Sequence, residues 1–379
     1  MSENVNKVNE EQVNAVIEKL ESKDFGIYFF TLDTKGNPAA GVANIYEHVK
    51  VLNELGYKAT ILHEKIDYKK FGNEDENGLA DWLGEEYANL PHVSIEAGAL
   101  NIGPQDFLII PEVFSTVMQQ KEVRSLPCKK IVFSQSHEYI FELLPLGRRW
   151  TDFGFNDVIT TSTKQGDYLK TLFPSIKSHV IPVAISSQFK PSSKPKLPIV
   201  AIHARNQSDV TKITKAFYLQ YPIYKWLTFK ELRGLSKAQF ADELSKACLA
   251  IWVDDVAGFG TFPLEAIESN TTVIAKIPNM IPEWMEEVDS DGNSTLKYNG
   301  LWTNSTLSIP ELISSYMKVW LEDSVPQELI DNMSKVKGVY SEENQKVKIE
   351  EVYDSLVQSR IGEFKNIIDS INAESTTNK

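Results

Sequence analysis

The segment from Ala250 to Lys276, AIWVDDVAGFGTFPLEAIESNTTVIAK, constrains the fold more than any other part of the chain. It predicts a buried strand over Ala250–Val253, a turn with acidic residues and glycines, a helix that opens at Pro263, and a second strand. Gly258 and Gly260 allow a ligand to approach the backbone, next to the free N–H groups of a helix N-terminus. The pattern indicates an anion site at the carboxyl end of a parallel sheet, although crossovers that bind nothing also carry glycine turns.

The same alternation of strands and helices continues through the 379 residues, a length that suits two domains. It predicts an α/β protein with parallel sheets, and a stretch rich in proline and lysine marks a linker between them. The expected parts are an N-terminal helix over 1–24, a Rossmann-like domain over 25–185, a linker over 186–198, a second Rossmann-like domain over 199–340, and a C-terminal helix with a polar tail over 341–379.

Hydrophobic periodicity also predicts the individual elements. The expected strands are Phe25–Leu32, Lys58–His63, Asp106–Pro111, Lys130–Ser134, Asp157–Thr161, His179–Ile181, Ile199–His203 and Tyr224–Phe229. The expected helices are Val42–Leu55, Leu79–Ala88, Ser115–Arg124, Thr163–Leu172, Val210–Tyr221, Lys237–Lys246, Ile309–Leu321, Gln327–Val336 and Glu342–Asn372. We expect Trp226 and Trp252 to pack in the core, and Glu283–Asp291 to form a solvated helix end and turn.

Composition narrows the class of protein. A hydrophobic content of 42% and a net charge of −13 are typical of a soluble globular protein without broad affinity for nucleic acid or anionic lipid. The longest apolar runs have the length of strands, so no integral membrane segment is expected. The N-terminus is acidic and polar, and Cys128 and Cys248 lie in separate apolar segments, which together indicate a cytoplasmic protein with reduced cysteines. The six histidines show no metal-ligand spacing, so no metal is expected.

Four segments resemble the retaining glycosyltransferases of family 4, also called glycosyl transferases group 1, which have the GT-B fold. In chain order they are KGNPAAGVANIYEHVKVLNELGYKATIL, DVITTSTKQGDYLKTLFPSIKSHVIPVAISSQF, ARNQSDVTK and AGFGTFPLEAIESNTTVIA. The last is the most specific, because it is similar to the family's glutamate motif. The resemblance spans residues 25–285 and implies two Rossmann-like domains that face each other across a cleft, with a C-terminal helix that crosses back.

The glutamate motif implies roles for individual residues. Glu265 matches the motif's second glutamate, which in the family binds the nucleotide ribose, and a carboxylate suits this role because it accepts from both ribose hydroxyls. Ala257 stands where the family has its first glutamate, near the donor sugar. This departure leaves three possibilities: a different donor sugar, weak catalysis, or a substitute acid, for which Asp254 and Asp255 are the candidates. We take Asp255 as the candidate catalytic acid.

The resemblance also implies a site for the donor diphosphate. Arg205 matches the family's arginine, whose guanidinium makes bidentate hydrogen bonds to phosphate and stabilises the leaving group. Lys212 is the candidate for the accompanying lysine, with Lys215 as the alternative; each is equally compatible with a solvated helix face. The backbone amides of the turn complete the expected donor site, which contains Gly258, Phe259, Gly260 and Thr261.

Fewer residues point to the acceptor side. Gly41, in the loop that starts at Gly36, is expected across the cleft from the diphosphate. His137 occupies the region where many family members place a histidine near the sugar, and it is a candidate catalytic residue, although it is also compatible with packing at a strand end. Glu138 is a weaker candidate, and His48 is expected to be structural.

Together the resemblance implies an enzyme that transfers a hexose from a UDP-sugar or GDP-sugar to a hydroxyl acceptor, with retention and without a cofactor. The acceptor is left open between a saccharide, a lipid-linked molecule and a nucleic-acid base, and the oligomeric state is open too. Three alternatives remain: a phage or viral enzyme that glycosylates DNA bases, a glycosyltransferase-like binding protein with weak catalysis, which Ala257 favours, and a sugar-nucleotide epimerase.

Overall fold

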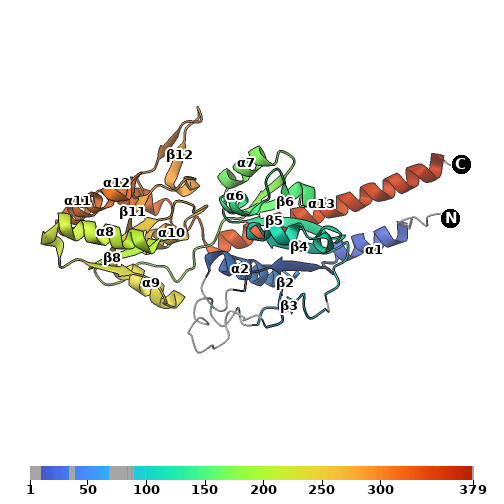
Figure 1. Cartoon of the computed structure of the whole chain (residues 1–379), viewed down its shortest axis with the longest axis horizontal. Coiled ribbons are helices and arrows are strands. Elements are labelled where there is room, and N and C mark those ends of the chain that lie inside the picture. Colours follow the sequence, from blue (N-terminus) through green and yellow to red (C-terminus); the bar gives the residue numbers. More distant parts are fainter. Residues whose placement is uncertain are drawn as a thin grey trace.

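The computed structural model describes residues 10–33, 39–67, 83, 87, 89–98 and 100–377, with side chains up to residue 373. Within them the chain forms two parallel sheets, each covered by helices, and one small antiparallel hairpin (Figure 1). The α/β class expected from the alternation is therefore confirmed. Gly36 and the helix expected over Leu79–Ala88 fall in the part of the chain outside this description, apart from residues 83 and 87 of that helix.

The first domain is built on a sheet of seven parallel strands in the order β3-β2-β1-β4-β5-β6-β7. Its central strands are buried along their whole length and apolar at their centres, as parallel strands must be when helices cover both sides. The strands are β1 Gly26–Phe30, β2 Lys58–His63, β3 His92–Ser94, β4 Phe107–Pro111, β5 Lys129–Ser134, β6 Asp157–Thr160 and β7 Lys177–Val180.

The second domain contains five parallel strands in the order β14-β11-β10-β8-β9. The strand order reverses beside β10, which is buried along its whole length and starts the glycine turn. Ligands bind at such switch points in open parallel sheets. The strands are β8 Leu197–Ala204, β9 Thr228–Glu231, β10 Ala247–Val253, β11 Thr272–Lys276 and β14 Leu301–Thr303.

Helices pack on both faces of each sheet, so that each domain has two apolar cores. The first domain contains α1 Glu10–Glu21, α2 Ala40–Glu54, α4 Ser115–Met118, α5 Lys121–Arg124, α6 Tyr139–Leu143 and α7 Thr163–Leu172. The second contains α8 Gln207–Gln220, α9 Lys237–Lys246, α10 Thr261–Glu268, α11 Ile309–Leu321 and α12 Gln327–Ser334. The last helix, α13 Glu342–Thr377, returns to the first domain.

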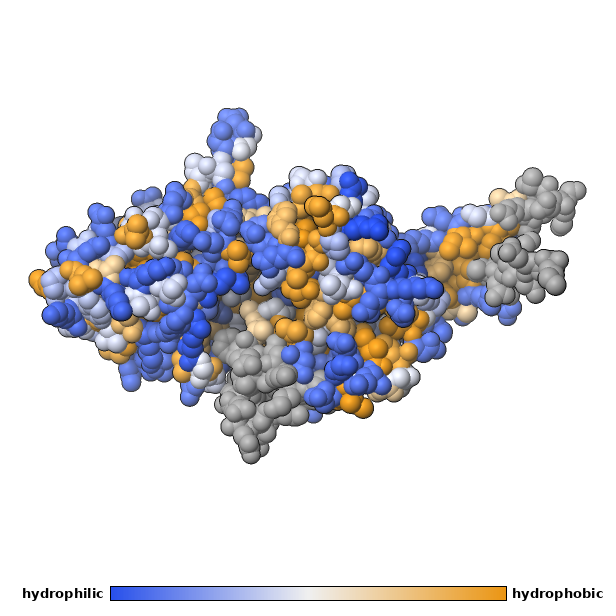
Figure 2. Space-filling view, in the orientation of Figure 1, coloured by the Kyte–Doolittle hydropathy of each residue, from blue (hydrophilic) through white to orange (hydrophobic). Residues whose placement is uncertain are grey.

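Helix α13 belongs to the first domain although it follows the second in sequence. Ile349, Tyr353 and Leu356 share one core with β1, α1 and α2. Figure 1 shows α13 running beside the first domain and projecting from it next to α1, and Figure 2 shows hydrophobic residues along that projecting end. The chain therefore passes between the domains twice, and the two passages meet where Ile185 N–H donates to the Tyr340 carbonyl at 2.7 Å.

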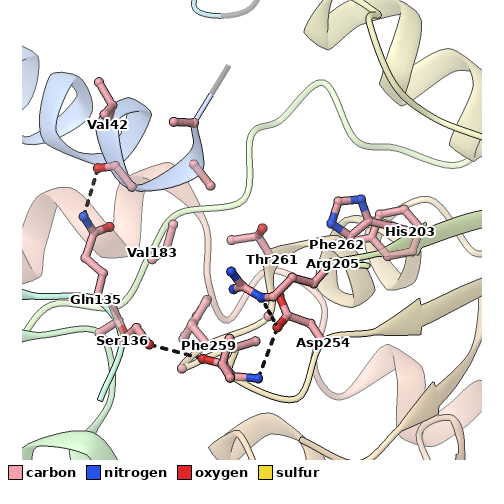
Figure 3. A pocket seen from close by; sticks show the side chains of 18 of the residues that line it. Val42, Gln135, Ser136, Val183, His203, Arg205, Asp254, Phe259, Thr261 and Phe262 are labelled. Carbon is pink, nitrogen blue, oxygen red and sulfur yellow. Dashed lines mark hydrogen bonds and ion pairs between the residues drawn. The ribbon is translucent and has the colours of Figure 1, made fainter. Parts of the chain in front are cut away.

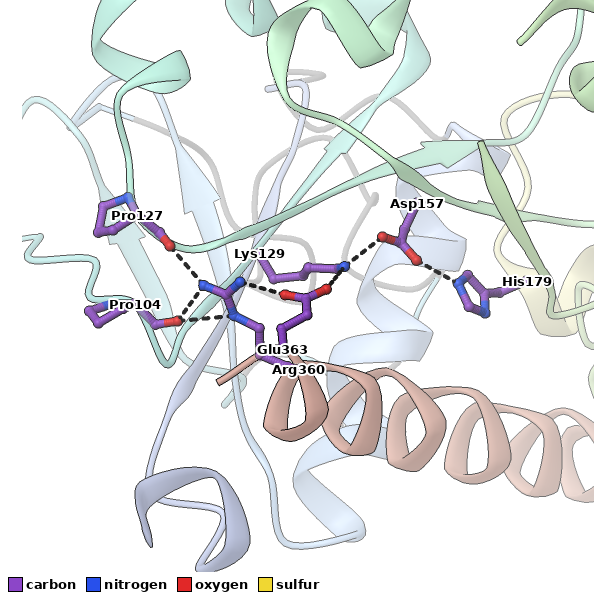
Figure 4. Close-up of polar contacts among 7 residues, drawn as sticks. All are labelled: Pro104, Pro127, Lys129, Asp157, His179, Arg360 and Glu363. Atoms are coloured by element: carbon purple, nitrogen blue, oxygen red, sulfur yellow. Dashed lines mark hydrogen bonds and ion pairs between the residues drawn. The ribbon is translucent and has the colours of Figure 1, made fainter. Parts of the chain in front are cut away.

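A charge network joins α13 to the amino-terminal edge of the first sheet, where Lys129 and Asp157 are buried (Figure 4). Lys129 Nζ lies 2.8 Å from Asp157 Oδ2 and 2.9 Å from Glu363 Oε1, and Asp157 Oδ1 pairs with His179 at 3.0 Å. Arg360 pairs with Glu363 and donates to the carbonyls of two prolines. Burial lowers the pKa of Lys129, but its two carboxylate partners outweigh burial and raise it overall. Because an unpaired charge here would be costly, the network specifies where α13 docks.

Three predictions about local structure are wrong. Tyr224 ends a 3₁₀ turn, and β9 begins only at Thr228, because Pro222 and the aromatic residues that follow it form a turn. Trp226 is 46% exposed and not in the core, whereas Trp252 is 2% exposed, as expected. The segment expected as a solvated helix end forms a short 3₁₀ turn and a hairpin of β12 Glu286–Val288 and β13 Ser294–Leu296.

Among the described residues, none of the helices combines the length and the apolar composition that crossing a bilayer requires.

Candidate functional site

A cleft with a volume of about 1240 Å³ lies between the two domains. Residues at or just after the carboxyl ends of strands in both sheets line it, including Glu112 after β4, Gln135 after β5 and Asp254 after β10. Figure 3 shows Gln135 and Ser136 on one wall and Arg205, Asp254 and the glycine turn on the other. The cleft therefore occupies the position where parallel α/β sheets bind ligands.

The glycine turn fits tightly into this cleft. Gly260 has a φ of +77°, and a Cβ atom added to it would lie 2.7 Å from the Trp252 ring. A Cβ atom added to Gly258 would lie 2.7 Å from the carbonyl oxygen of Gln135, which belongs to the other domain. Both positions therefore require glycine, one for its backbone conformation and both for space. Helix α10 begins directly after the turn at Thr261, two residues before the expected start at Pro263.

Arg205 follows β8, and its guanidinium faces the cleft (Figure 3). Its Nε lies 2.7 Å from Asp254 Oδ1, and the same oxygen accepts the Val256 N–H at 3.2 Å. Asp254 thus connects the arginine to the glycine turn. Because the contact uses Nε and leaves the terminal nitrogens out of this pair, Arg205 retains donors with which to bind an anion.

Glu265 lies on α10, one turn of helix beyond Thr261, and lines the cleft. Burial raises the pKa of this carboxyl to about 7, and the charge of Lys237 opposes the shift only in part. Ala257, at the position where the resemblance implies a glutamate, also lines the cleft. Asp254 is the carboxylate near Ala257 that reaches the cleft wall.

Three of the predicted site residues do not line the cleft. Lys212 is exposed on α8 and pairs with Asp209 at 3.7 Å. The Asp255 carboxylate points away to Lys276, at 2.6 Å. His137 is buried behind the wall, where its ring packs against Tyr168 at 5.8 Å. Lys212 and Asp255 point away from the cleft because neighbouring residues in a turn or helix face different directions. The spacing of residues in the sequence does not reveal these directions.

On the first domain, Gly41 lies at the start of α2 and lines the cleft, as expected. Its carbonyl accepts a hydrogen bond from Gln135 Nε2 at 2.9 Å (Figure 3). Gln135 Oε1 in turn accepts from Asn44 Nδ2 at 3.0 Å. This amide holds the start of α2 against the loop that follows β5. His48, one turn after Asn44, is fully buried among aromatic rings.

Sequence reasoning missed several residues of the cleft. Arg233, after β9, is a second cation in the lining and donates to the Ala204 carbonyl at 3.3 Å. His203 stacks on Phe262 with ring centroids 5.2 Å apart, and burial is the main cause that lowers its pKa. Glu112 also lines the cleft and was not predicted from the sequence. Each lies at or just after the carboxyl end of a strand, and that position was the signal that could have identified them. No group of residues that could hold a metal ion occurs in the described part of the chain.

No protein-family model matches the chain, but a curated protein is similar to it in sequence. The sequence is 24% identical over 255 residues to an alpha-1,6-glucosyltransferase of Actinobacillus pleuropneumoniae serotype 7 (strain AP76), a match that covers 66% of this chain and 72% of that protein.

Two solved structures share the architecture over nearly the whole chain. The pneumococcal O-GlcNAc transferase GtfA, in complex with UDP and GlcNAc, superposes with a TM-score of 0.60 at 12% identity and covers 89% of this chain and 99% of its own. The Anabaena protein Alr3699/HepE, in complex with UDP-glucose, gives 0.56 at 12% identity, with coverage of 87% and 99%. The chain therefore has the fold of the GT-B glycosyltransferases, which confirms the expected fold class.

Proposed function

We propose that this protein is a glycosyltransferase that transfers a hexose from a nucleoside diphosphate sugar to a hydroxyl acceptor. The observation that carries the proposal is that Arg205, the turn Gly258–Gly260 and Glu265 line one wall of the cleft. This wall provides a cation, backbone amides and a carboxylate, the three kinds of group that a nucleotide sugar requires. The sequence similarity to a glucosyltransferase supports the same reading.

The donor diphosphate binds between Arg205 and the amides of the glycine turn in this proposal. Arg233 has the diphosphate-binding role that the resemblance implied for Lys212, because Arg233 lines the cleft and Lys212 does not. Glu265 accepts hydrogen bonds from the ribose hydroxyls. The guanidinium of Arg205 stabilises the charge that develops on the leaving diphosphate as the bond to the sugar breaks. No metal or cofactor is required in this scheme.

We further propose UDP-glucose as the donor and retention of the anomeric configuration. UDP is the nucleotide bound in the GtfA structure, and UDP-glucose is the ligand of the Anabaena protein. Retention rests on the resemblance of the glutamate motif. Asp254 supplies the carboxylate that Ala257 lacks, because it lines the cleft beside Ala257 and orients Arg205.

Calorimetric titration with UDP, GDP and ADP, followed by assays with the corresponding glucose donors and simple glycoside acceptors, tests the proposal. We expect UDP to bind and UDP-glucose to be hydrolysed or transferred. Absence of binding by all three nucleotides would refute the proposal. Binding without hydrolysis or transfer would instead support a glycosyltransferase-like binding protein, the alternative that Ala257 favours; activity gained in Ala257→Glu would then identify the missing carboxylate.

The pH dependence of donor binding tests Glu265 separately. The ionised carboxylate accepts from the ribose hydroxyls, so binding favours ionisation, and a proton competes with the donor below the pKa of about 7. The affinity for UDP-glucose is therefore expected to be constant above about pH 8 and to fall by up to about tenfold per pH unit below pH 7. UDP-glucose suits this calorimetric titration because its diphosphate, esterified at both ends, lacks the ionisation near pH 6 of a terminal phosphate. Glu265→Gln should bind more weakly with a flat profile; a parent profile that is also flat would contradict the assignment.

A further inference from the structure

Glu112 is a buried carboxyl group on the first-domain wall of the cleft. It follows β4 directly, in a 3₁₀ turn over Glu112–Phe114, and it lines the cleft although only 2% of its surface is exposed. Carboxyl groups are almost never this buried without partners, because removing the charge from water is costly. The contacts of Glu112 therefore have to account for the burial of its carboxyl group.

Among the described residues, neighbouring residues use only one of its two oxygens. Oε1 accepts the backbone N–H groups of Gln135 at 2.9 Å and Ser136 at 2.8 Å. Oε2 accepts no hydrogen bond from another residue that the structure describes. Burial raises the pKa of this carboxyl to about 7, and the backbone N–H groups of Gln135, Ser136 and Glu112 itself offset that shift only in part. In its ionised form the carboxylate needs a hydrogen-bond donor at this oxygen, and the hydroxyl of a ligand can supply one.

The loop that Glu112 holds lies directly against the donor wall. Ser136 Oγ donates to the Val256 carbonyl at 3.2 Å, and the Gln135 carbonyl is the atom that leaves no room for a Cβ atom at Gly258. The unused oxygen therefore lies one loop away from the turn assigned to the donor diphosphate. It belongs to the first domain, across the cleft from the wall assigned to the donor.

Apolar side chains surround this part of the cleft. Leu32, Pro111, Val113 and Phe114 line it together with Glu112. Leu32 is 51% exposed, and Phe114 is supported by Phe30 at a ring separation of 4.7 Å. A single carboxyl group in an apolar wall matches a ligand that presents one hydroxyl next to an apolar group.

We propose that Glu112 binds the acceptor hydroxyl through Oε2, and that Leu32, Val113 and Phe114 contact an apolar group next to that hydroxyl. The proposal rests on the transferase function proposed above and assigns its acceptor class, an amphiphilic hydroxyl compound such as an alkyl or lipid-linked glycoside. Glu112 is then an acceptor-binding residue that also positions the Gln135–Ser136 loop through its other oxygen.

Glu112→Gln separates these two roles. Glutamine keeps an Oε1 for the two backbone N–H groups but replaces Oε2 with an NH₂ group, which donates and does not accept. The probes are octyl β-D-glucopyranoside, below its micelle concentration, and methyl β-D-glucopyranoside, which lacks the alkyl chain. Binding is measured by ligand-observed NMR on the full chain, both with saturating UDP and without it.

We expect the parent to bind the octyl glycoside at least tenfold more tightly than the methyl glycoside, and Glu112→Gln to weaken octyl glycoside binding at least tenfold. The affinity for UDP should remain unchanged in this variant. Glu122→Gln, an exposed glutamate of α5 away from the cleft, is the matched control and should bind like the parent.

Each other outcome overturns the proposal. A parent that binds neither glycoside, or both equally, refutes the acceptor class. Parental octyl glycoside binding in Glu112→Gln refutes the role of Oε2, and a parallel loss of UDP affinity would mean that Glu112 is only structural. Failure of the parent to bind UDP would instead refute the proposed function, and the titrations without UDP would still decide the role of Glu112.

Discussion

Replacing Arg205 with alanine is expected to lower kcat/KM for sugar transfer by about 10²–10³-fold. The guanidinium lines the cleft, and Asp254 holds it at 2.7 Å through Nε, so its terminal nitrogens are already oriented when the donor arrives. Its loss removes charge stabilisation from the leaving diphosphate, mostly in the transition state. Steady-state kinetics with UDP-glucose, together with UDP titration, would show a larger effect on kcat than on nucleotide affinity.

Two further variants sharpen this test. Arg205→Lys should recover only part of the activity, because an ammonium group cannot make the paired, planar contacts of a guanidinium. Lys212→Ala should retain parental kinetics, since Lys212 is exposed and pairs with Asp209 outside the cleft. A loss in Lys212→Ala as large as that in Arg205→Ala would contradict the assignment of the diphosphate site.

Gly258→Ala is expected to reduce transfer about 10²-fold while UDP binding changes little. The added methyl group would lie 2.7 Å from the Gln135 carbonyl, a backbone atom of the opposite domain that cannot rotate away. The domains must therefore separate slightly, and the donor and acceptor walls move apart. The nucleotide contacts assigned to Arg205, Glu265 and the backbone amides of the glycine turn all belong to one domain and move together, and alanine keeps its backbone N–H, so these contacts should survive.

Gly362→Ala, in α13, is the matched control, because nothing lies within 4 Å of its added Cβ atom. It should be fully active and slightly more stable, as alanine is favoured in a helix. Kinetics and small-angle scattering of both variants with UDP bound would check the expectation. Parental activity in Gly258→Ala would show that the close approach of the two walls is not needed for transfer.

The elements that sequence reasoning predicted well are those with strong local patterns. Lys58–His63, Thr163–Leu172 and Ile309–Leu321 have the predicted bounds. A buried parallel strand needs a continuous apolar run, and a surface helix needs an apolar stripe, so the pattern records the environment of each residue. The segment 283–296 lacks such a pattern, because most of its hairpin is exposed, and its strands were missed.

The candidate site was only partly predictable for a related reason. Gly260 and Gly258 follow from the local need for a tight turn, and Glu265 follows from its distance along the same motif. Glu112 and Arg233 lie far from that motif in sequence and reach the cleft only because strand ends of two sheets meet there. Residues that only the topology brings together have no characteristic spacing in the sequence. They could be found only by treating every residue that follows a strand as a candidate site residue.

The return of α13 has a consequence for how the chain is made. Its residues Ile349, Tyr353 and Ile361 complete the core that also contains Val13 and Phe29, near the beginning of the chain. A ribosome synthesises the whole second domain before it reaches these residues. The first domain therefore leaves the ribosome with an unfinished apolar face, and it completes its core only after α13 has emerged.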